Sequence, residues 1–145
     1  MVKAKLFVLI ALAALLAVGS HFISDMGSKP KPELNLSRTR TTANGSFVVS
    51  IEPEILEIKL GELHAWIVTV KTPDGAPVAD AGFEIAGGMP DHNHGLPTSP
   101  QVTENLGEGR YRLEGVKFSM TGWWELSFDI TSGETRDGVT FNMVL

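Results

Sequence analysis

An antiparallel β-sandwich of immunoglobulin-like type, with about seven or eight strands, is the all-β fold class that the sequence predicts. Apolar and polar residues alternate with a period of two from Phe47 to the C-terminus. Turn residues, mainly Gly, Pro and Asp, interrupt this alternation every ~8–12 residues, as in sandwich domains. No segment after residue 24 repeats apolar residues at helical spacing over three turns. We therefore expect one β-sandwich domain over residues 46–145.

The first 23 residues predict an export signal. Lysines lie at positions 3 and 5, residues 6–18 are apolar, and small residues follow at 19 and 20. This order is the pattern of a secretory signal peptide. The apolar stretch 6–23 is also just long enough to span a bilayer, so a retained membrane-anchor helix stays an alternative. Either way, we expect the domain to be exported, either periplasmic or anchored facing the periplasm.

Residues 24–45 predict a flexible linker between that segment and the domain. They are rich in Pro, Ser, Thr, Asn and basic residues and contain two Leu. Neither the helical nor the strand period continues through them, and this composition is typical of a tether.

The remaining residues divide into segments of alternating pattern separated by turn residues. Val116 and Phe118 fall out of step after Gly115, which indicates a β-bulge. Alternation places Trp66 and Trp124 on the inward face of their strands. The expected strands cover residues 47–51, 56–60, 63–71, 78–86, 101–106, 110–118, 123–131 and 139–145.

Strand direction predicts which residues share an end of the sandwich. Successive antiparallel strands run in opposite directions, so every second connection lies at the same end. This places His64, the loop 87–100, Met120 and Trp123 at one end. The loop is about 14 residues long, whereas hairpin loops have 2–5, and long loops in small domains are usually functional or disordered.

Sulfur and imidazole ligands converge at that end. The loop supplies Met89, His92 and His94, and Met120 follows on a neighbouring connection. Thioether sulfur favours Cu(I), and imidazole binds copper in either oxidation state. Zinc fits less well, because thioether is a poor zinc ligand and no third histidine or fixed carboxylate accompanies the pair. The sequence therefore predicts a copper site formed by these four residues, although a solvated histidine pair and a Met120 that fills the core are the structural alternatives.

Three further residues are less certain members of the site. His64 shares a strand face with Trp66, so a buried histidine competes with a ligand. Asp91 can cap the loop backbone or orient a histidine. Trp123 points away from the core and could cover a metal or contact a partner.

Composition and motifs exclude several classes of function. The chain has 145 residues, with 12 Lys+Arg, 17 Asp+Glu and no Cys. A net charge of −5 argues against nucleic acid as a partner. The absence of Cys excludes disulfides, thiolate metal sites and a Cys nucleophile. The chain has neither a Gly-x-Ser-x-Gly elbow nor a phosphate-binding glycine loop, and we expect no enzyme.

Three blocks of residues together resemble the FixH/YtkA-like family. The similarity extends over roughly residues 60–145. It implies an immunoglobulin-like fold, an exported or membrane-anchored domain, and a copper-binding or copper-delivery role in the bacterial envelope, with a link to respiratory oxidase assembly for some members. By position, Met89, His92, His94 and Met120 fall in the matching motifs. The blocks are residues 88–98 (GMPDHNHGLPT), 109–111 (GRY) and 118–125 (FSMTGWWE).

Two hypotheses of function follow. In the first, the chain is an extracytoplasmic copper-binding module, a metallochaperone that passes its ion to an envelope protein. In the second, it is a metal-free accessory domain whose loop end, with Trp123, docks on an envelope membrane complex such as a respiratory oxidase or transporter. In both, the chain contacts the membrane only through residues 1–23, if these are not cleaved.

Overall fold

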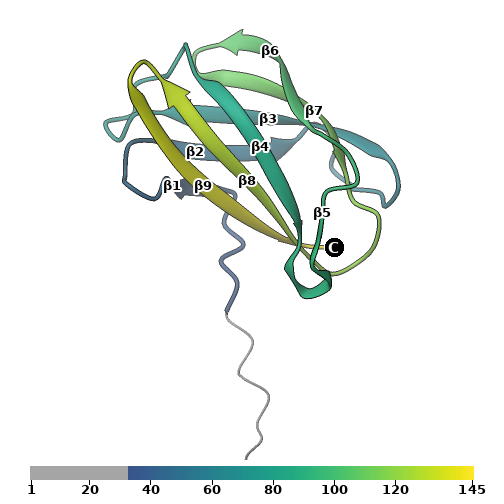
Figure 1. The fold of residues 1–145 in the computed structure, drawn as a ribbon. Coiled ribbons are helices and arrows are strands. Elements are labelled where there is room, and N and C mark those ends of the chain that lie inside the picture. Colours follow the sequence, from purple (N-terminus) through teal and green to yellow (C-terminus); the bar gives the residue numbers. More distant parts are fainter. Residues whose placement is uncertain (1–32) are drawn as a thin grey trace, which may run out of the picture. The chain divides into compact units, whose positions relative to one another are not determined.

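The computed structural model describes residues 33–145, which form two antiparallel sheets packed face to face (Figure 1). One sheet has the strand order β1-β2-β3-β7-β6, and the other has the order β5-β4-β8-β9. The all-β sandwich is thereby confirmed. The strands are β1 (Thr39–Thr41), β2 (Val48–Pro53), β3 (Leu63–Lys71), β4 (Gly82–Met89), β5 (His94–Gly95), β6 (Gln101–Gly107), β7 (Arg110–Lys117), β8 (Trp123–Ser132) and β9 (Thr135–Val144), with one 3-10 turn, η1 (Pro90–His92).

The expected signal or anchor over residues 1–23 and the first part of the expected linker lie outside the described residues. Within residues 33–145, no helix has the length and apolar character needed to cross a membrane.

The core forms where the inward faces of the two sheets meet. Trp66 and Trp124 are fully buried, as their alternation predicts. Tyr111 joins core to backbone, since its hydroxyl donates to the Val78 carbonyl at 2.6 Å and accepts from the Ala81 N–H at 2.9 Å. The largest other buried side chains come from both sheets: Phe118, Phe128, Phe141, Ile51, Met89, Leu113, Leu126, Ile130 and Met143.

Order in the sandwich begins earlier than the linker prediction implied. Residues 39–41 form β1, which pairs with β2 through Thr39 opposite Ser50. The Arg40 guanidinium donates to the Thr140 carbonyl on β9, so β1 also connects the two sheets. Backbone pairing holds this three-residue strand in place, and its side chains are largely outside the core. Its sequence therefore shows no apolar alternation.

The buried Asp137 carboxylate fastens the turn after β1 to β9. It accepts hydrogen bonds from the backbone N–H groups of Asn44 at 3.0 Å and Ser46 at 3.1 Å. Burial of the Asp137 carboxyl favours its neutral form, but hydrogen bonds from Thr42, Ser46, Asn44 and Gly138 outweigh this effect. They hold the pKa of Asp137 well below its ordinary value.

The strand predicted over residues 56–60 is wrong. These residues connect β2 to β3, and Leu56 is completely exposed. The two strands are antiparallel neighbours, so the chain must reverse its direction between them. β2 ends at Pro53, and the Glu54 N–H donates to the Ala65 carbonyl at 2.9 Å, beyond which the connection leaves the sheet.

Two other local predictions concern the strands that carry the site. The bulge near Gly115 is confirmed, since the register of β3 against β7 shifts between His64 and Trp66. The segment 87–100 is more regular than a long loop. Its first half extends β4 to Met89, turns through η1 and returns as β5, so that it forms a hairpin.

Candidate functional site

The β4–β5 hairpin carries three of the four predicted copper ligands. Its tip is the turn η1, in which proline occupies the first position, where its fixed φ suits the backbone and no N–H is needed. Asn93 ends the turn in the left-handed conformation at φ 51°, which asparagine tolerates better than most residues. Met89 and His94 are direct partners across the two strands. In such a pair both side chains leave the same face, with Cβ atoms about 4.5–5.5 Å apart.

A pair of glycines lets three strands approach closely beneath this hairpin. A Cβ atom on Gly87 would lie 2.2 Å from the Glu125 carbonyl oxygen of β8, and one on Gly88 would lie 2.2 Å from the His94 carbonyl oxygen of β5. Neither position has space for a side chain. The close approach brings the hairpin against β8, where the rings of His94 and Trp124 form a T-shaped contact with centroids 5.8 Å apart.

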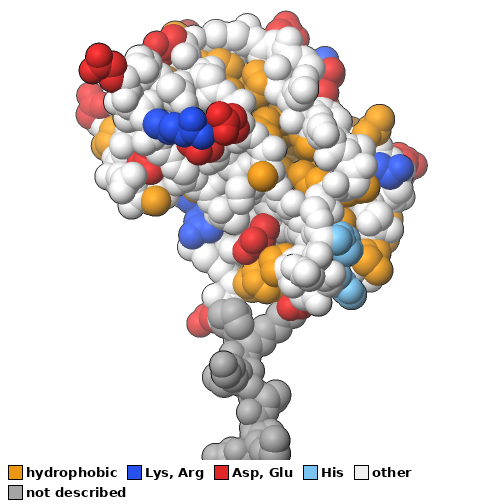
Figure 2. Space-filling view, viewed as in Figure 1, with side chains coloured by type: hydrophobic (Ala, Val, Ile, Leu, Met, Phe, Trp, Pro, Cys, Tyr) orange, Lys and Arg blue, Asp and Glu red, His pale blue; other side chains and the backbone are white. Residues whose placement is uncertain are grey.

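The two loop histidines are neighbours and both are exposed. Their ring centroids are 5.9 Å apart. The Nδ1 atom of His94 lies 3.1 Å from the Gly95 carbonyl oxygen, which makes this nitrogen the hydrogen-bonding one and leaves Nε2 for another partner. Figure 2 shows exposed histidine side chains beside hydrophobic ones at this part of the surface.

Met89 faces the core below the histidines. Its side chain is 1 % exposed, and its Cε atom would lie 2.8 Å from a Cβ on Gly122. The Met89 methyl group therefore packs on the connection between β7 and β8. Met89 thus links the hairpin to the segment that carries Met120.

Met120 lies on the connection between β7 and β8, and its side chain is 40 % exposed. The Trp124 indole N–H donates to its carbonyl oxygen at 3.0 Å, which fixes the Met120 backbone beside the ring that His94 contacts. The C-terminal residue fastens the same connection, because Gly122 and Leu145 exchange two backbone hydrogen bonds of 2.9 and 3.1 Å. Figure 1 shows the C-terminus at the same end as the β4–β5 hairpin.

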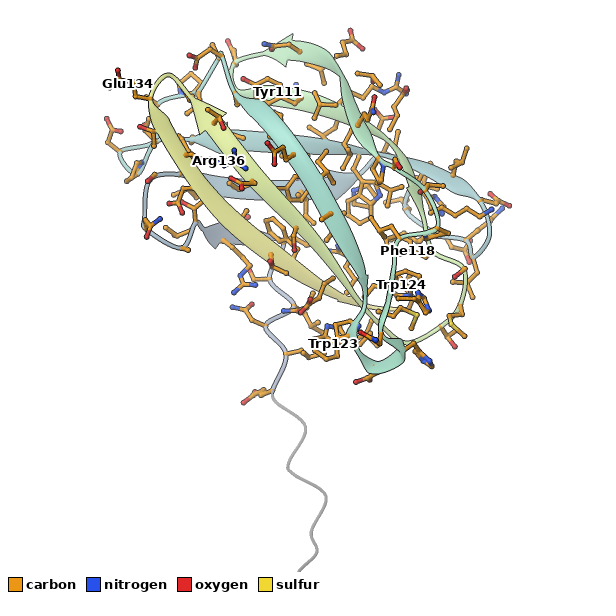
Figure 3. All side chains as sticks on the ribbon, viewed as in Figure 1. Tyr111, Phe118, Trp123, Trp124, Glu134 and Arg136 are labelled. Carbon is orange, nitrogen blue, oxygen red and sulfur yellow. The ribbon has the colours of Figure 1, made fainter. Side chains whose placement is uncertain are left out.

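The structure therefore places the four predicted ligands at one end of the sandwich, on the β4–β5 hairpin and on the connection between β7 and β8. Figure 3 shows Trp123, Trp124 and Phe118 at this end, with Tyr111, Glu134 and Arg136 distant from it. Three of the predicted residues present exposed side chains, His92, His94 and Met120, whereas Met89 lies beneath them.

The three less certain residues take different positions. His64 is buried, 3 % exposed, and stacks on Phe118 with centroids 6.3 Å apart, so it belongs to the interior of this end. Asp91 is exposed in η1 beside His92. Trp123 lies on the outer face of β8, where its indole N–H donates to Asn142 Oδ1 at 3.0 Å.

Glu125 is a residue of this end that the sequence analysis did not single out. It lines a hollow of about 370 Å³ together with His94, Met89 and the glycine pair. It stands opposite Gly88 in the pairing of β4 with β8. The only sequence signal was Gly87-Gly88, which marks a place of close backbone approach without saying what approaches.

Sulfur ligands would have to contribute to any metal site at this end. Within residues 33–145, no three side chains of His, Cys, Asp or Glu gather closely enough to hold a metal ion. A metal held by the two histidines would therefore need a thioether from Met89 or Met120 as well. This donor set matches Cu(I) better than Zn²⁺.

Comparison with known proteins bears on the whole of this region. The sequence pattern of the YtkA-like family matches residues 41–129, which is more than half of the chain. The chain belongs to the YtkA-like family. The matched part of the YtkA-like domain includes the hairpin, Met120 and most of β8. The search of curated proteins found no match. Among solved structures, the ZirS C-terminal domain is similar at 14 % identity, with a TM-score of 0.39, over 84 % of this chain and 86 % of that one.

Proposed function

We propose that the YtkA-like domain is a non-catalytic, extracytoplasmic copper-binding module that holds one ion at its hairpin end and passes it to an envelope protein. The observation that carries the proposal is the cross-strand pairing of Met89 with His94 beside Trp124. It puts a thioether and an imidazole on one face of a two-strand hairpin, with a second imidazole 5.9 Å away. Met120, held next to Trp124, supplies a second thioether.

The exposure of the ligands suits exchange of the ion. His92, His94 and Met120 are open to solvent, so a partner's ligands could reach copper without unfolding the domain. Met89 would bind from the buried side. Because protons compete with a metal ion for imidazole nitrogen, the affinity should weaken as the solution is acidified.

An anaerobic titration of the full chain with Cu(I), in competition with a chromophoric chelator, tests this proposal. Trp124 gives a second readout, because its ring contacts His94 and its fluorescence should change on binding. We expect one equivalent to bind. Replacing both His92 and His94 by Ala, or Met120 by Leu, should weaken binding at least about tenfold, as loss of a metal ligand or its support typically does.

Met143→Leu is the matched control. It removes the same thioether from a buried residue that pairs with Trp124 across β8 and β9 but is not a predicted ligand. It should leave the affinity unchanged. Nonspecific binding in the wild-type chain, or equal affinity in all variants, would end the copper proposal.

The alternative function, a metal-free accessory domain, is favoured by exposed apolar side chains at the same end. The side chains of Leu60, Leu63 and Met120 are 43 %, 67 % and 40 % exposed. The connection that carries Leu60 is attached there, since the Gly61 N–H donates to the Phe118 carbonyl at 2.8 Å. An apolar surface of this kind suits docking on an envelope complex. Failure of the copper titration would leave this function in place.

A further inference from the structure

One side of the sandwich is open between the edges of its two sheets. β4 lies at this edge of its sheet for most of its length, because the short β5 pairs only with Gly88 and Met89 at its end. A hollow of about 590 Å³ lies between the rest of β4 and the start of β6, and its lining includes the half-buried Phe83, Ile85 and Val102. Figure 2 shows hydrophobic side chains along this gap, between the strands that Figure 1 labels β4 and β6.

The backbone of β4 presents hydrogen-bonding groups to this hollow. In an antiparallel ladder, the N–H and C=O groups of successive residues alternate between the two sides of a strand. The Gly87 carbonyl accepts from the Leu96 N–H at 3.1 Å, on the side away from β8. Phe83 and Ile85 are four and two residues before Gly87, so their groups point to the same side. β5 does not extend this far, and within residues 33–145 no strand pairs with β4 there.

The other sheet edges are blocked in the ways that natural proteins use to prevent pairing. β9 is covered by the segment before β2, from which Arg40 donates to the Thr140 carbonyl and the Ala43 N–H to the Gly138 carbonyl. β1 has only three residues, and β6 has two register shifts against β7. β4 pairs with β8 over seven consecutive residues without a shift. It is therefore a regular strand whose open edge can accept another strand.

The charge beside the hollow favours a basic occupant. Glu84 is the one charged residue of the lining, and its side chain is 74 % exposed. Arg136 donates to Glu84 at 2.9 Å, but it also donates to Asp129 at 2.7 Å. One guanidinium thus serves two carboxylates, and this group of three side chains keeps a net negative charge. A lysine or arginine on an added strand would offset that charge.

A second copy of the chain is a poor occupant for the same reason. If two β4 edges paired antiparallel with Phe83 opposite Ile85, the two Glu84 side chains would lie directly opposite each other. Like charges in that position destabilise a sheet. The favoured occupant is therefore a strand from a different protein.

We propose that β4 binds an extended segment of a partner protein in which apolar residues alternate with lysine or arginine. The segment would be antiparallel to β4, in line with β5, and would pair with the backbone of Phe83 and Ile85. Its apolar side chains would enter the hollow beside Val102, and its basic side chains would lie on the outer face near Glu84. In strand addition, main-chain hydrogen bonds give affinity and alternate side chains give specificity. The site shares no residue with the predicted copper ligands and does not depend on copper binding.

Hydrogen exchange of the free, full-length chain tests the open edge. The amides of Phe83 and Ile85 should exchange rapidly, because their N–H groups face the hollow. The Glu84 amide should exchange slowly, because that residue pairs with Asp129 of β8. Slow exchange at all three positions would refute the open edge.

A peptide titration followed by ¹H–¹⁵N NMR tests the occupant. The probe is acetyl-Lys-Val-Lys-Val-Lys-amide, whose five residues match positions 82–86 and place a lysine opposite Glu84. We expect saturable shifts of the Phe83 and Ile85 amides, and slower exchange of both. A peptide with glutamate in place of each lysine should bind at least about fivefold more weakly. A peptide with N-methylated valines loses the N–H groups that face β4 and should bind at least about tenfold more weakly.

Variants assign the binding to β4. Ile85→Pro removes an N–H that faces the hollow and no hydrogen bond to β8, and proline is accepted at such edge positions. It should weaken binding of the lysine peptide at least about fivefold. Glu84→Gln should weaken it at least about threefold and narrow the preference for lysine over glutamate. Glu134→Gln removes the same charge from the exposed turn between β8 and β9, outside the lining, and should leave the affinity unchanged.

Three results of the titration would overturn the proposal: no saturable shift, equal affinity for the lysine and glutamate peptides, or full affinity of the N-methylated peptide. Protection of the Phe83 and Ile85 amides that grows with protein concentration, without peptide, would identify a second copy as the occupant and would also overturn it. If Ile85→Pro does not fold, the N-methylated peptide decides the role of the same hydrogen bonds. None of these outcomes bears on copper binding at the hairpin.

Discussion

Replacing Gly87 by alanine should damage the fold at the place where β4 meets β8. The added Cβ would lie 2.2 Å from the Glu125 carbonyl oxygen and 3.2 Å from Leu96 Cδ1. Ordinary contact begins at 3.4 Å, so the first distance is about 1.2 Å too short. The obstructing atom is backbone of a paired strand, which cannot rotate away, and the strands themselves must separate.

Overpacking of this kind typically costs about 1–3 kcal/mol, occasionally more. Gly82→Ala is the matched control in the same strand, because its Cβ would meet only the Thr131 carbonyl oxygen at an ordinary 3.8 Å. That change should be neutral or stabilise the domain by about 0.4–1 kcal/mol, since alanine restricts the unfolded chain. The two substitutions are identical in chemistry, but only Gly87→Ala should destabilise the domain.

Urea unfolding followed by tryptophan fluorescence measures both variants, with scanning calorimetry as a second method. For a domain near this size, each kcal/mol corresponds to a shift of about 4–8 °C in Tm. Gly87→Ala should therefore melt clearly below the wild type and Gly82→Ala at or above it. Equal stability of the two variants would show that β4 and β8 are not as close as the structure places them, and the position of His94 against Trp124 would lose its basis.

The remaining predictions concern the core, acid stability and the surface. Tyr111→Phe leaves the Val78 carbonyl and the Ala81 N–H without their side-chain partner, and should cost about 1–3 kcal/mol in urea unfolding; a loss below the error of the method would refute the role of the hydroxyl. Because the pKa of Asp137 is lowered in the folded state, its contribution is present at neutral pH and is lost as the pH falls below the ordinary aspartate value near ~3.9. Asp137→Asn should therefore be less stable than the wild type at pH 7, and the difference should shrink at pH 3; a constant difference would contradict the lowered pKa. Leu56→Gln should leave the unfolding midpoint unchanged, because this side chain is fully exposed, and a large loss would restore the predicted strand there.

Much of the fold could be predicted, because most strands bury one face and so display it in the sequence. The alternation of apolar and polar residues placed Trp66 and Trp124 on the inward faces of their strands, and both are in the core. β1 and β5 escaped prediction because three and two residues, held by backbone pairing, carry no pattern. The segment 56–60 shows the opposite failure, since its alternation is real but the chain must turn there to join two neighbouring strands.

The placement of the candidate ligands at one end of the sandwich was predictable, because strand directions alternate. The internal arrangement of the site was not. The pairing of Met89 with His94 depends on a tight turn through η1 inside what looked like a long loop. The approach of Glu125 depends on which strand lies next to β4. The β8 residues that pair with β4 are 37 to 49 residues further along the chain. Local sequence carries no information of that kind.

The two backbone hydrogen bonds between Leu145 and Gly122 have a practical consequence for purification of this protein. A polyhistidine tag fused after Leu145 would emerge beside the connection that carries Met120 and would bring many extra imidazoles within reach of the hairpin. Such a tag would bind added copper itself, and the measured number of copper ions per chain would then include those bound by the tag. Recombinant versions should be prepared without any extension at this end.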